Sequence, residues 1–155
     1  MTPAINLLIK QKLAHEVLQY EHDASAESFG LEAAEKLNLA PNLVYKTLVV
    51  KLDSQTLCVA ILPVERMLSM KLLAKAAGAK KAQMADKAEV ERVTGYVLGG
   101  VSPLGQKKRL MTVIDESAQK LTNMYVSAGK RGLEINLAPQ ALIQLLSARF
   151  APLCQ

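Results

Sequence analysis

The sequence contains no tryptophan and few other aromatic residues or cysteines. Its 155 residues include four tyrosines, two phenylalanines and two cysteines, whereas half of all residues are hydrophobic. A chain of this length can bury an aliphatic core within one domain, which we place at residues 1–155. Cys58 and Cys154 form neither a disulfide framework nor a metal-ligand spacing, so we expect a protein that folds without metal in a reducing cytoplasm.

Segments that would direct the chain to a membrane are also missing. The N-terminal residues begin an ordinary helix, without the charged region, apolar run and cleavage site of a signal peptide. No apolar stretch approaches the roughly 18 residues of a membrane span. We therefore expect no membrane partner. The net charge of +5, from 19 Lys and Arg against 14 Asp and Glu, is compatible with an anionic partner such as nucleic acid.

Familiar catalytic motifs are absent as well. Within residues 100–104 (GVSPL), Leu104 occupies the position of the last glycine in a G-x-S-x-G nucleophile elbow. Gln106 follows Gly105 where a phosphate-binding P-loop requires lysine. His15 and His22 are the sole histidines, which disfavours a serine triad. Because H-E-x-x-H and C-x-x-C are missing too, we expect no metal and no cofactor.

Helix and strand patterns alternate without the regular period of a doubly wound sheet. Thr2 can cap a first helix and Ser69 a later one, while Asp86 and Glu89 have the spacing of a capping box. Two β-rich runs around a turn at 53–55 predict a hairpin. We therefore expect a mixed α+β domain. Its helices are predicted near 2–13, 30–37, 69–77, 86–94 and from 139 onward, and its strands near 15–20, 44–52, 57–62, 81–84, 111–114, 124–126 and 133–137.

The segment 94–105 is the densest concentration of glycine, with four of the eight glycines in the chain. Glycine permits positive φ angles and close approach of a ligand to the backbone. Lys107, Lys108 and Arg109 follow at once. A donor-rich loop beside positive charge can hold an anion or a polar carbonyl group. The alternative interpretation is a tight turn between two strands.

Lys46 and Tyr20 are two further candidates. Lys46 lies in the otherwise apolar run 44–50, where it is either an outward-facing charge on an edge strand or a partly buried donor in a site. Tyr20 ends a predicted strand and precedes polar residues. It is either an aromatic residue at the rim of the fold with a hydrated hydroxyl group or part of a pocket.

Seven segments of the chain form a recognisable combination: 2–4 (TPA), 20–23 (YEHD), 29–30 (FG), 45–48 (YKTL), 84–87 (MADK), 94–109 (TGYVLGGVSPLGQKKR) and 125–132 (YVSAGKRG). Taken together, they make the chain resemble the YbaK/EbsC family of free-standing aminoacyl-tRNA deacylases, relatives of the editing domain inserted in bacterial prolyl-tRNA synthetase. The resemblance covers nearly the whole chain and is strongest in the glycine-rich block.

The resemblance implies a fold, a reaction and partners. The fold would be a twisted mixed, partly barrel-like sheet of about six to seven strands surrounded by helices. The reaction would be hydrolysis of the ester in mischarged Cys-tRNA(Pro), with Cys-tRNA(Cys) as a further substrate. The partners would be the acceptor end of the tRNA and prolyl-tRNA synthetase. One departure is Ala128, where close relatives carry glycine; its methyl group could narrow a turn or the pocket rim.

The resemblance also assigns roles to residues. The essential lysine of the family falls on Lys46, and its substrate-binding loop falls on residues 99–103. The implied catalytic residues are Lys46, Gly100, Val101 and Ser102. The implied substrate-binding residues are Tyr20, Phe29, Thr47, Gly99, Pro103, Ser127 and Gly129. The basic residues Lys80, Lys81, Lys107, Lys108, Lys130 and Arg131 would contact tRNA phosphates, although each is equally compatible with a solvated surface.

In this family the substrate is thought to supply its own nucleophile. The thiol of the cysteinyl group would attack its carbonyl carbon, while backbone N–H groups around residues 100–102 hold the carbonyl oxygen. Lys46 would bind a phosphate or hydroxyl group of the terminal adenosine. The rival hypothesis is a non-catalytic module that holds an aminoacyl or nucleotide end, or docks on a synthetase.

Overall fold

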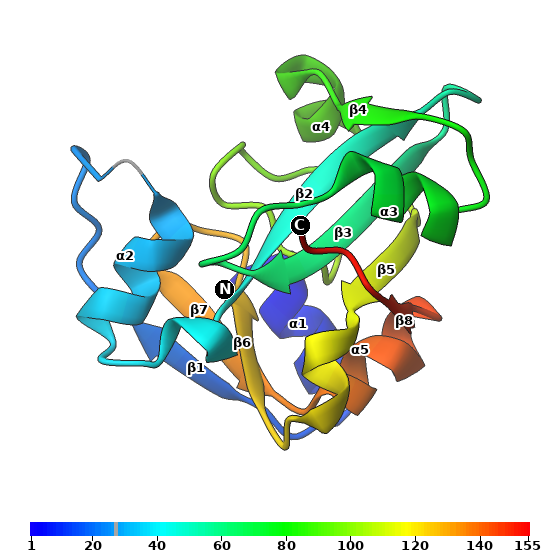
Figure 1. Ribbon diagram of the computed structural model, residues 1–155. Helices are drawn as coiled ribbons and strands as arrows, with labels where there is room; N and C mark the ends of the chain where they lie inside the picture. The colour runs from blue at the N-terminus through cyan, green and yellow to red at the C-terminus, as the bar shows by residue number, and fades with distance from the viewer. Residues whose placement is uncertain (27) are drawn as a thin grey trace.

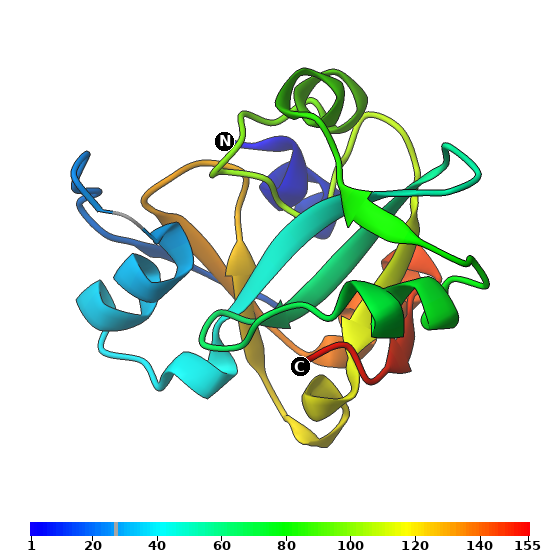
Figure 2. The same ribbon diagram turned by 45° about the horizontal axis from the view of Figure 1, so that its top comes forward.

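The computed structural model describes residues 1–26 and 28–155, and the side chain of Phe29 lies outside the description. Figures 1 and 2 show helices packed around two twisted sheets. The helices are α1 (Pro3–Lys10), α2 (Phe29–Lys36), α3 (Met70–Ala76), α4 (Lys87–Thr94) and α5 (Pro139–Leu146), with 3-10 turns η1 (Pro41–Leu43) and η2 (Glu116–Lys120). The strands are β1 (Glu16–Gln19), β2 (Tyr45–Leu52), β3 (Leu57–Pro63), β4 (Ala82–Met84), β5 (Met111–Asp115), β6 (Met124–Ser127), β7 (Leu133–Leu137) and β8 (Arg149–Ala151).

The strands divide between two sheets. One has the order β1-β7-β6 and is antiparallel throughout. The other has the order β4-β2-β3-β5-β8 and is mixed, because β5 runs parallel to both β3 and β8. The predicted α+β fold and the β2–β3 hairpin are confirmed. The prediction of about six to seven strands in one sheet differs from the eight strands in two sheets of the described chain, since β8 is too short to show a pattern in the sequence.

The helix starts are set largely by capping side chains. The hydroxyl groups of Thr2 and Ser69 accept the N–H groups of Ile5 and Leu72, as predicted. The predicted capping box at Asp86 is wrong, because the Asp86 side chain makes no capping hydrogen bond. Glu89 instead pairs with Lys51 on β2, with 3.0 Å between Nζ and Oε1.

Two apolar clusters cover opposite faces of the five-stranded sheet. One joins it to the three-stranded sheet and to α1 and α5, while the other packs it against α3. The alternation of β2 therefore sends Tyr45 and Val49 into the first cluster and Leu48 and Val50 toward the second. Cys58 is fully buried, and burial raises the pKa of its thiol to about 11, as expected for a core residue.

The first half of β2 is the place where the two sheets meet. β4 pairs with β2 only from Val50 onward, and Val44 bridges to Tyr125 of β6. The residues before Val50 therefore have no partner on β4 and lie where β2 approaches β6. Across residues 1–26 and 28–155, no helix has the length and apolar character needed to cross a membrane.

Candidate functional site

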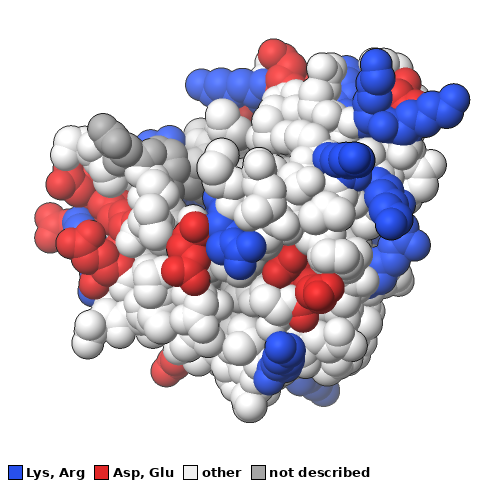
Figure 3. Space-filling model, viewed as in Figure 1, with Lys and Arg blue, Asp and Glu red and all other residues white. Residues whose placement is uncertain are grey.

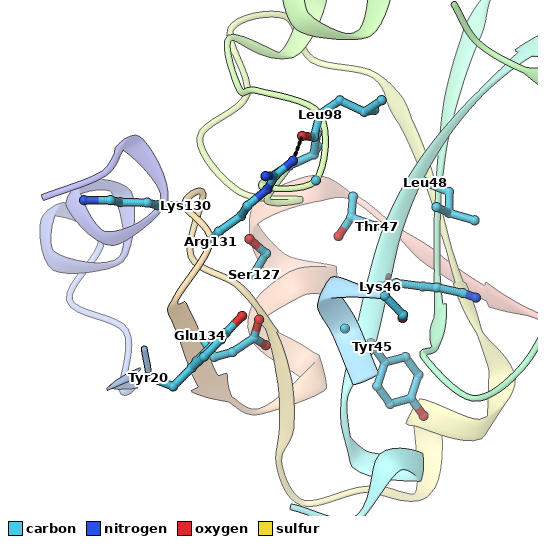
Figure 4. Close-up of a pocket in the computed structure, with 14 residues that line it drawn as sticks. Tyr20, Tyr45, Lys46, Thr47, Leu48, Leu98, Ser127, Lys130, Arg131 and Glu134 are labelled. Carbon is cyan, nitrogen blue, oxygen red and sulfur yellow. Dashed lines mark hydrogen bonds between the residues drawn. The ribbon is translucent and has the colours of Figure 1, made fainter. Parts of the chain in front are cut away.

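A cavity of about 350 Å³ opens between β2, the ends of β6 and β7, the glycine-rich segment and the start of α2 (Figure 4). Eight of the residues that the sequence singled out line it, although they come from four separate parts of the chain. The lining residues are Tyr20, Ser28, Gly30, Tyr45, Lys46, Thr47, Leu48, Leu98, Gly99, Val101, Ser127, Lys130, Arg131 and Glu134.

Two side-chain atoms in this cavity are buried without a hydrogen-bond partner. They are Thr47 Oγ1 and Glu134 Oε2, and within the described chain they are the two buried side-chain oxygen or nitrogen atoms in that state. An unpaired buried polar atom costs free energy, on the order of 1–3 kcal/mol. Both residues, Thr47 and Glu134, line the same cavity, which indicates that the cavity is suited to a polar ligand.

Glu134 is the functional candidate that the sequence did not reveal. It lies on β7 opposite Ser127 of β6, so both side chains point from one face of the sheet into the cavity. Glu134 is only 6% exposed, and burial raises the pKa of its carboxyl group to about 8. The alternation of Leu133, Ile135 and Leu137 predicts that Glu134 lies on the solvated face of the strand. In the folded protein this face is covered, because the start of α2 forms the opposite wall of the cavity.

The start of α2 supplies the opposite wall. Gly30 packs against Val64, and a Cβ atom at Gly30 would lie 2.3 Å from Val64 Cγ1. Glu32 then holds the loop that follows Tyr20: its carboxylate accepts the Asp23 N–H at 2.7 Å and contacts His22 Nδ1 at 2.7 Å. These contacts fix the loop between Tyr20 and α2, next to Glu134.

Tyr20 and Lys46 both turn out to be cavity residues that are partly buried. The Tyr20 N–H donates to the Gly132 carbonyl group, and burial raises the pKa of its hydroxyl group. Burial also lowers the pKa of the Lys46 ammonium group. Figure 4 shows Lys46 and Leu48 pointing to one side of β2 and Thr47 to the other, as strand alternation requires.

The glycine-rich segment contributes fewer groups than the sequence predicts. Gly99 and Val101 line the cavity, whereas Gly100, Ser102 and Pro103 are buried in the wall behind it. The expectation that the Gly100 N–H holds a carbonyl oxygen is wrong in this structure, because that N–H donates to the Val97 carbonyl group at 2.8 Å. The Ser102 hydroxyl group accepts the Leu104 N–H.

Gly129, Ala128 and Phe29, which the resemblance also singled out, are not shown to contribute side chains to the cavity. Gly129 has a φ angle of +102°, and a Cβ atom there would lie 2.4 Å from the Tyr96 ring. It is absent from the cavity lining. The methyl group of Ala128 is fully buried in the core, so it narrows neither the cavity nor its rim. For Phe29, only the backbone at the start of α2 is described.

The basic residues predicted to contact tRNA separate into three groups. Lys130 and Arg131 line the cavity, and Arg131 Nη2 donates to the Leu98 carbonyl group at 3.2 Å. Lys107 and Lys108 are exposed where their N–H groups bond to the end of α4.

The third group lies elsewhere. The N–H groups of Lys80 and Lys81 bond to Asp53, beyond the far end of β2. Asp53 lies seven positions after Lys46 along β2 and its end, which is roughly 23 Å in an extended strand. Lys80 and Lys81 therefore lie away from the cavity, and their contact with tRNA phosphates stays a prediction. Figure 3 shows acidic side chains gathered over the α2 side of the molecule and basic ones along the opposite edge.

No set of three or more His, Cys, Asp or Glu side chains in residues 1–26 and 28–155 is arranged to hold a metal ion. Among the described residues that line the cavity there is no cysteine and no histidine. The chemical groups on offer are a carboxyl group, hydroxyl groups, backbone amides and cations. This set can hold and orient a polar substrate with an ammonium group and an ester.

Comparison with known proteins identifies the family. Residues 25–145 match the model of the aminoacyl-tRNA editing domain. EbsC of Enterococcus faecalis, assigned as a Cys-tRNA(Pro)/Cys-tRNA(Cys) deacylase, is 38% identical over 97% of this chain and 91% of its own length. A proline–tRNA ligase of Thermoanaerobacter is 28% identical over 83% of this chain and 23% of the ligase.

A solved structure has the same fold. It is a candidate trans-editing enzyme for prolyl-tRNA synthetase, with a TM-score of 0.80, 22% identity and coverage of 98% of this chain and 92% of that one. The cavity lies within the matched residues, apart from Tyr20. From its sequence and its fold, the chain belongs to the aminoacyl-tRNA editing domain family.

Proposed function

We propose that this protein hydrolyses the ester bond of mischarged Cys-tRNA(Pro), and also of Cys-tRNA(Cys), as a free-standing editing enzyme in the compartment where tRNA is charged, the cytoplasm. The observation that carries the proposal is the pair of unpartnered atoms, Thr47 Oγ1 and Glu134 Oε2, in the cavity of an editing-domain chain. The 38% identity to EbsC supports the choice of substrate.

Glu134 recognises the free ammonium group of the aminoacyl moiety. An ammonium group placed beside the buried carboxyl group favours its ionised form and supplies the partner that Oε2 lacks. Ser127, opposite Glu134 on β6, adds a hydroxyl group within the same wall. The α-nitrogen of an N-acetylated or peptidyl residue is a neutral amide, so the site selects a residue whose α-amino group is free.

Thr47 and the amides of Gly99 and Val101 hold the carbonyl oxygen. Thr47 Oγ1 can donate its proton to that oxygen, which satisfies the second unpartnered atom. As the carbonyl carbon becomes tetrahedral, its oxygen becomes negative. A donor aimed at this oxygen is worth about 3 kcal/mol of transition-state stabilisation.

The nucleophile is the thiol of the substrate. Its sulfur forms a bond to the carbonyl carbon, the ester C–O bond breaks, and the proton from the thiol goes to the leaving ribose oxygen, which becomes the terminal hydroxyl group of the tRNA. Water then opens the resulting cyclic thioester to give cysteine. The enzyme need only hold the thiol and the carbonyl group in a reactive geometry. Lys46 binds a phosphate or hydroxyl group of the terminal adenosine.

The direct test measures release of cysteine from Cys-tRNA(Pro) by the purified protein. Thr47→Val and Lys46→Ala should each lower kcat/KM about 10–100-fold, whereas Ser54→Ala, in the exposed β2–β3 turn, serves as the matched control. Absence of turnover by the unaltered protein would leave the rival function of a non-catalytic binding module. Equal rates on Ala-tRNA(Pro) would exclude attack by the substrate thiol.

Prolyl-tRNA synthetase is the partner that would add specificity for the tRNA body. The support for this is the family relation to a domain within proline–tRNA ligase. The short basic stretches described above bind phosphates without reading sequence. A synthetase added to the assay should therefore lower KM for Cys-tRNA(Pro) more than for Cys-tRNA(Cys).

A further inference from the structure

Asp115, the last residue of β5, is a buried carboxylate that the proposed mechanism does not use. It is 5% exposed and is not among the described residues that line the cavity. Its oxygens accept the Leu153 N–H at 3.0 Å, the Ser117 N–H at 3.2 Å and the Ser117 hydroxyl group at 2.5 Å. Burial raises the pKa of this carboxyl group, but the hydrogen bonds outweigh burial and hold the pKa below its ordinary value. The group is therefore an ionised acceptor inside the fold.

A second hydroxyl group continues from Ser117 toward the cavity. The hydroxyl oxygens of Tyr45 and Ser117 are 2.8 Å apart. Because an ionised carboxylate only accepts hydrogen bonds, Ser117 donates its proton to Asp115 and accepts the proton of Tyr45. The result is a directed hydrogen-bond chain from the Tyr45 hydroxyl group through Ser117 to Asp115. Tyr45 is 2% exposed, and it lines the cavity.

The start of β2 is the part of the strand that gains most from such an anchor. β4 pairs with β2 only from Val50 onward. In the part of the chain that the structure describes, the earlier residues of β2 therefore pair along one edge, with β3. An isolated bridge from Val44 to Tyr125 links this end to β6. A strand segment paired along one edge has fewer backbone hydrogen bonds to hold its position than a central one.

Tyr45 and Thr47 lie on the same face of β2. The register of β2 with β3 is regular from Tyr45 to Lys51, so residues two apart point to the same side. Thr47 carries one of the two unpartnered atoms of the cavity, and Tyr45 is its neighbour on that face toward the start of the strand. Fixing the Tyr45 ring at its hydroxyl end therefore restrains the direction in which Thr47 Oγ1 points.

We propose that Asp115 is a positioning residue that holds the start of β2 through the hydroxyl groups of Ser117 and Tyr45. The anchored strand in turn aims Thr47 Oγ1 at the carbonyl oxygen of the substrate. This inference rests on the proposed function and deepens it, since it names what keeps the proposed donor in place. A donor to a developing negative charge has to be in position before the reaction, because a small displacement weakens it strongly.

The experiment measures deacylation of Cys-tRNA(Pro) by Tyr45→Phe and by Ser117→Ala, each of which removes one hydroxyl group of the chain. Each change should lower kcat about three- to tenfold with KM nearly unchanged, because Thr47 acts on charge that develops in the transition state. The two changes together should lower kcat no more than either alone, since one broken link already frees the strand. Tyr125→Phe is the matched control, because the Tyr125 hydroxyl group makes no hydrogen bond within residues 1–26 and 28–155.

A double-mutant cycle separates positioning from a general loss of stability. In Thr47→Val the donor is already absent, so adding Tyr45→Phe should have no further effect on kcat. All rates are divided by the concentration of folded protein. If Tyr45→Phe lowers kcat by the same factor with and without Thr47, the hydrogen-bond chain only stabilises the fold, and the proposal is overturned.

A second readout needs no turnover. The γ2 methyl group of Thr47 should change its 13C NMR shift in Ser117→Ala, although Ser117 is not among the described residues that line the cavity. It should keep its shift in Ser54→Ala, in the exposed β2–β3 turn. An unchanged Thr47 signal in Ser117→Ala would also overturn the proposal. If the signal moves but the unaltered protein does not hydrolyse Cys-tRNA(Pro), the anchoring is supported and the proposed function fails.

Discussion

Replacing Glu134 by glutamine tests the electrostatics of the cavity without changing its shape. The folded protein holds the pKa of this carboxyl group at about 8 because the group is buried, whereas the ordinary value is 4.5. Between these two pH values the folded state binds a proton that the unfolded state has released. Stability should therefore fall as the pH rises through this window.

The size of the effect follows from one proton over the window. Each pH unit contributes up to about 1.4 kcal/mol, so the unaltered protein should lose about 2–3 kcal/mol of unfolding free energy between pH 5 and pH 7 through this group. Glutamine does not ionise. Glu134→Gln should thus lose less stability over the same range and be the more stable protein at pH 8.

The assay is urea denaturation of both proteins at pH 5, 6, 7 and 8, with the difference in unfolding free energy plotted against pH. Other titrating groups cancel in this difference. Parallel curves for the two proteins would refute the reasoning. Deacylation should at the same time fall about 10–100-fold in Glu134→Gln, since a neutral amide binds an ammonium group less well. A gain in stability with a loss of activity is typical of a functional residue.

Three further predictions concern the surroundings of the cavity. Gly129→Ala should lower the unfolding free energy by about 2–4 kcal/mol, because its Cβ atom would meet the Tyr96 ring at 2.4 Å. Gly78→Ala, with a φ angle of +73° but no described atom within 4 Å, should lose about 1 kcal/mol. Urea denaturation compares the two variants, and equal losses would contradict the steric argument. Ala128→Gly should cost about 1 kcal/mol in the same assay and leave kcat/KM for Cys-tRNA(Pro) unchanged, because its methyl group packs in the core; a changed KM would place Ala128 at the rim after all. Converting Lys107 and Lys108 to glutamate should raise KM for Cys-tRNA(Pro) and reduce the slope of log affinity against log salt concentration by about one to two. The same change at Lys80 and Lys81 should have a smaller effect, and the reverse order would indicate that the tRNA binds at the far end of β2.

Local sequence was sufficient where a local interaction decides the structure. Thr2 and Ser69 cap their helices because a hydroxyl group three residues before a free N–H at a helix start lies within hydrogen-bonding reach of it. The alternation of β2 and β3 and the turn between them predicted the hairpin for the same reason. Asp86 shows the limit, since Glu89 finds a better partner in Lys51 across the fold.

The sequence by itself determined the family, because a glycine-rich block of this kind together with Lys46 and Thr47 is specific, and the match over residues 25–145 confirms it. Only the tertiary structure decided which residues share the cavity. Glu134 is polar and lies in an alternating strand, so its pattern is that of a solvated residue until α2 and the loop after Tyr20 close over it. The Gly100 N–H is likewise not available to a ligand, because it donates to the Val97 carbonyl group in a turn that forms only in the folded segment. Burial and hydrogen-bond partners depend on what comes from elsewhere in the chain, and no local pattern contains that information.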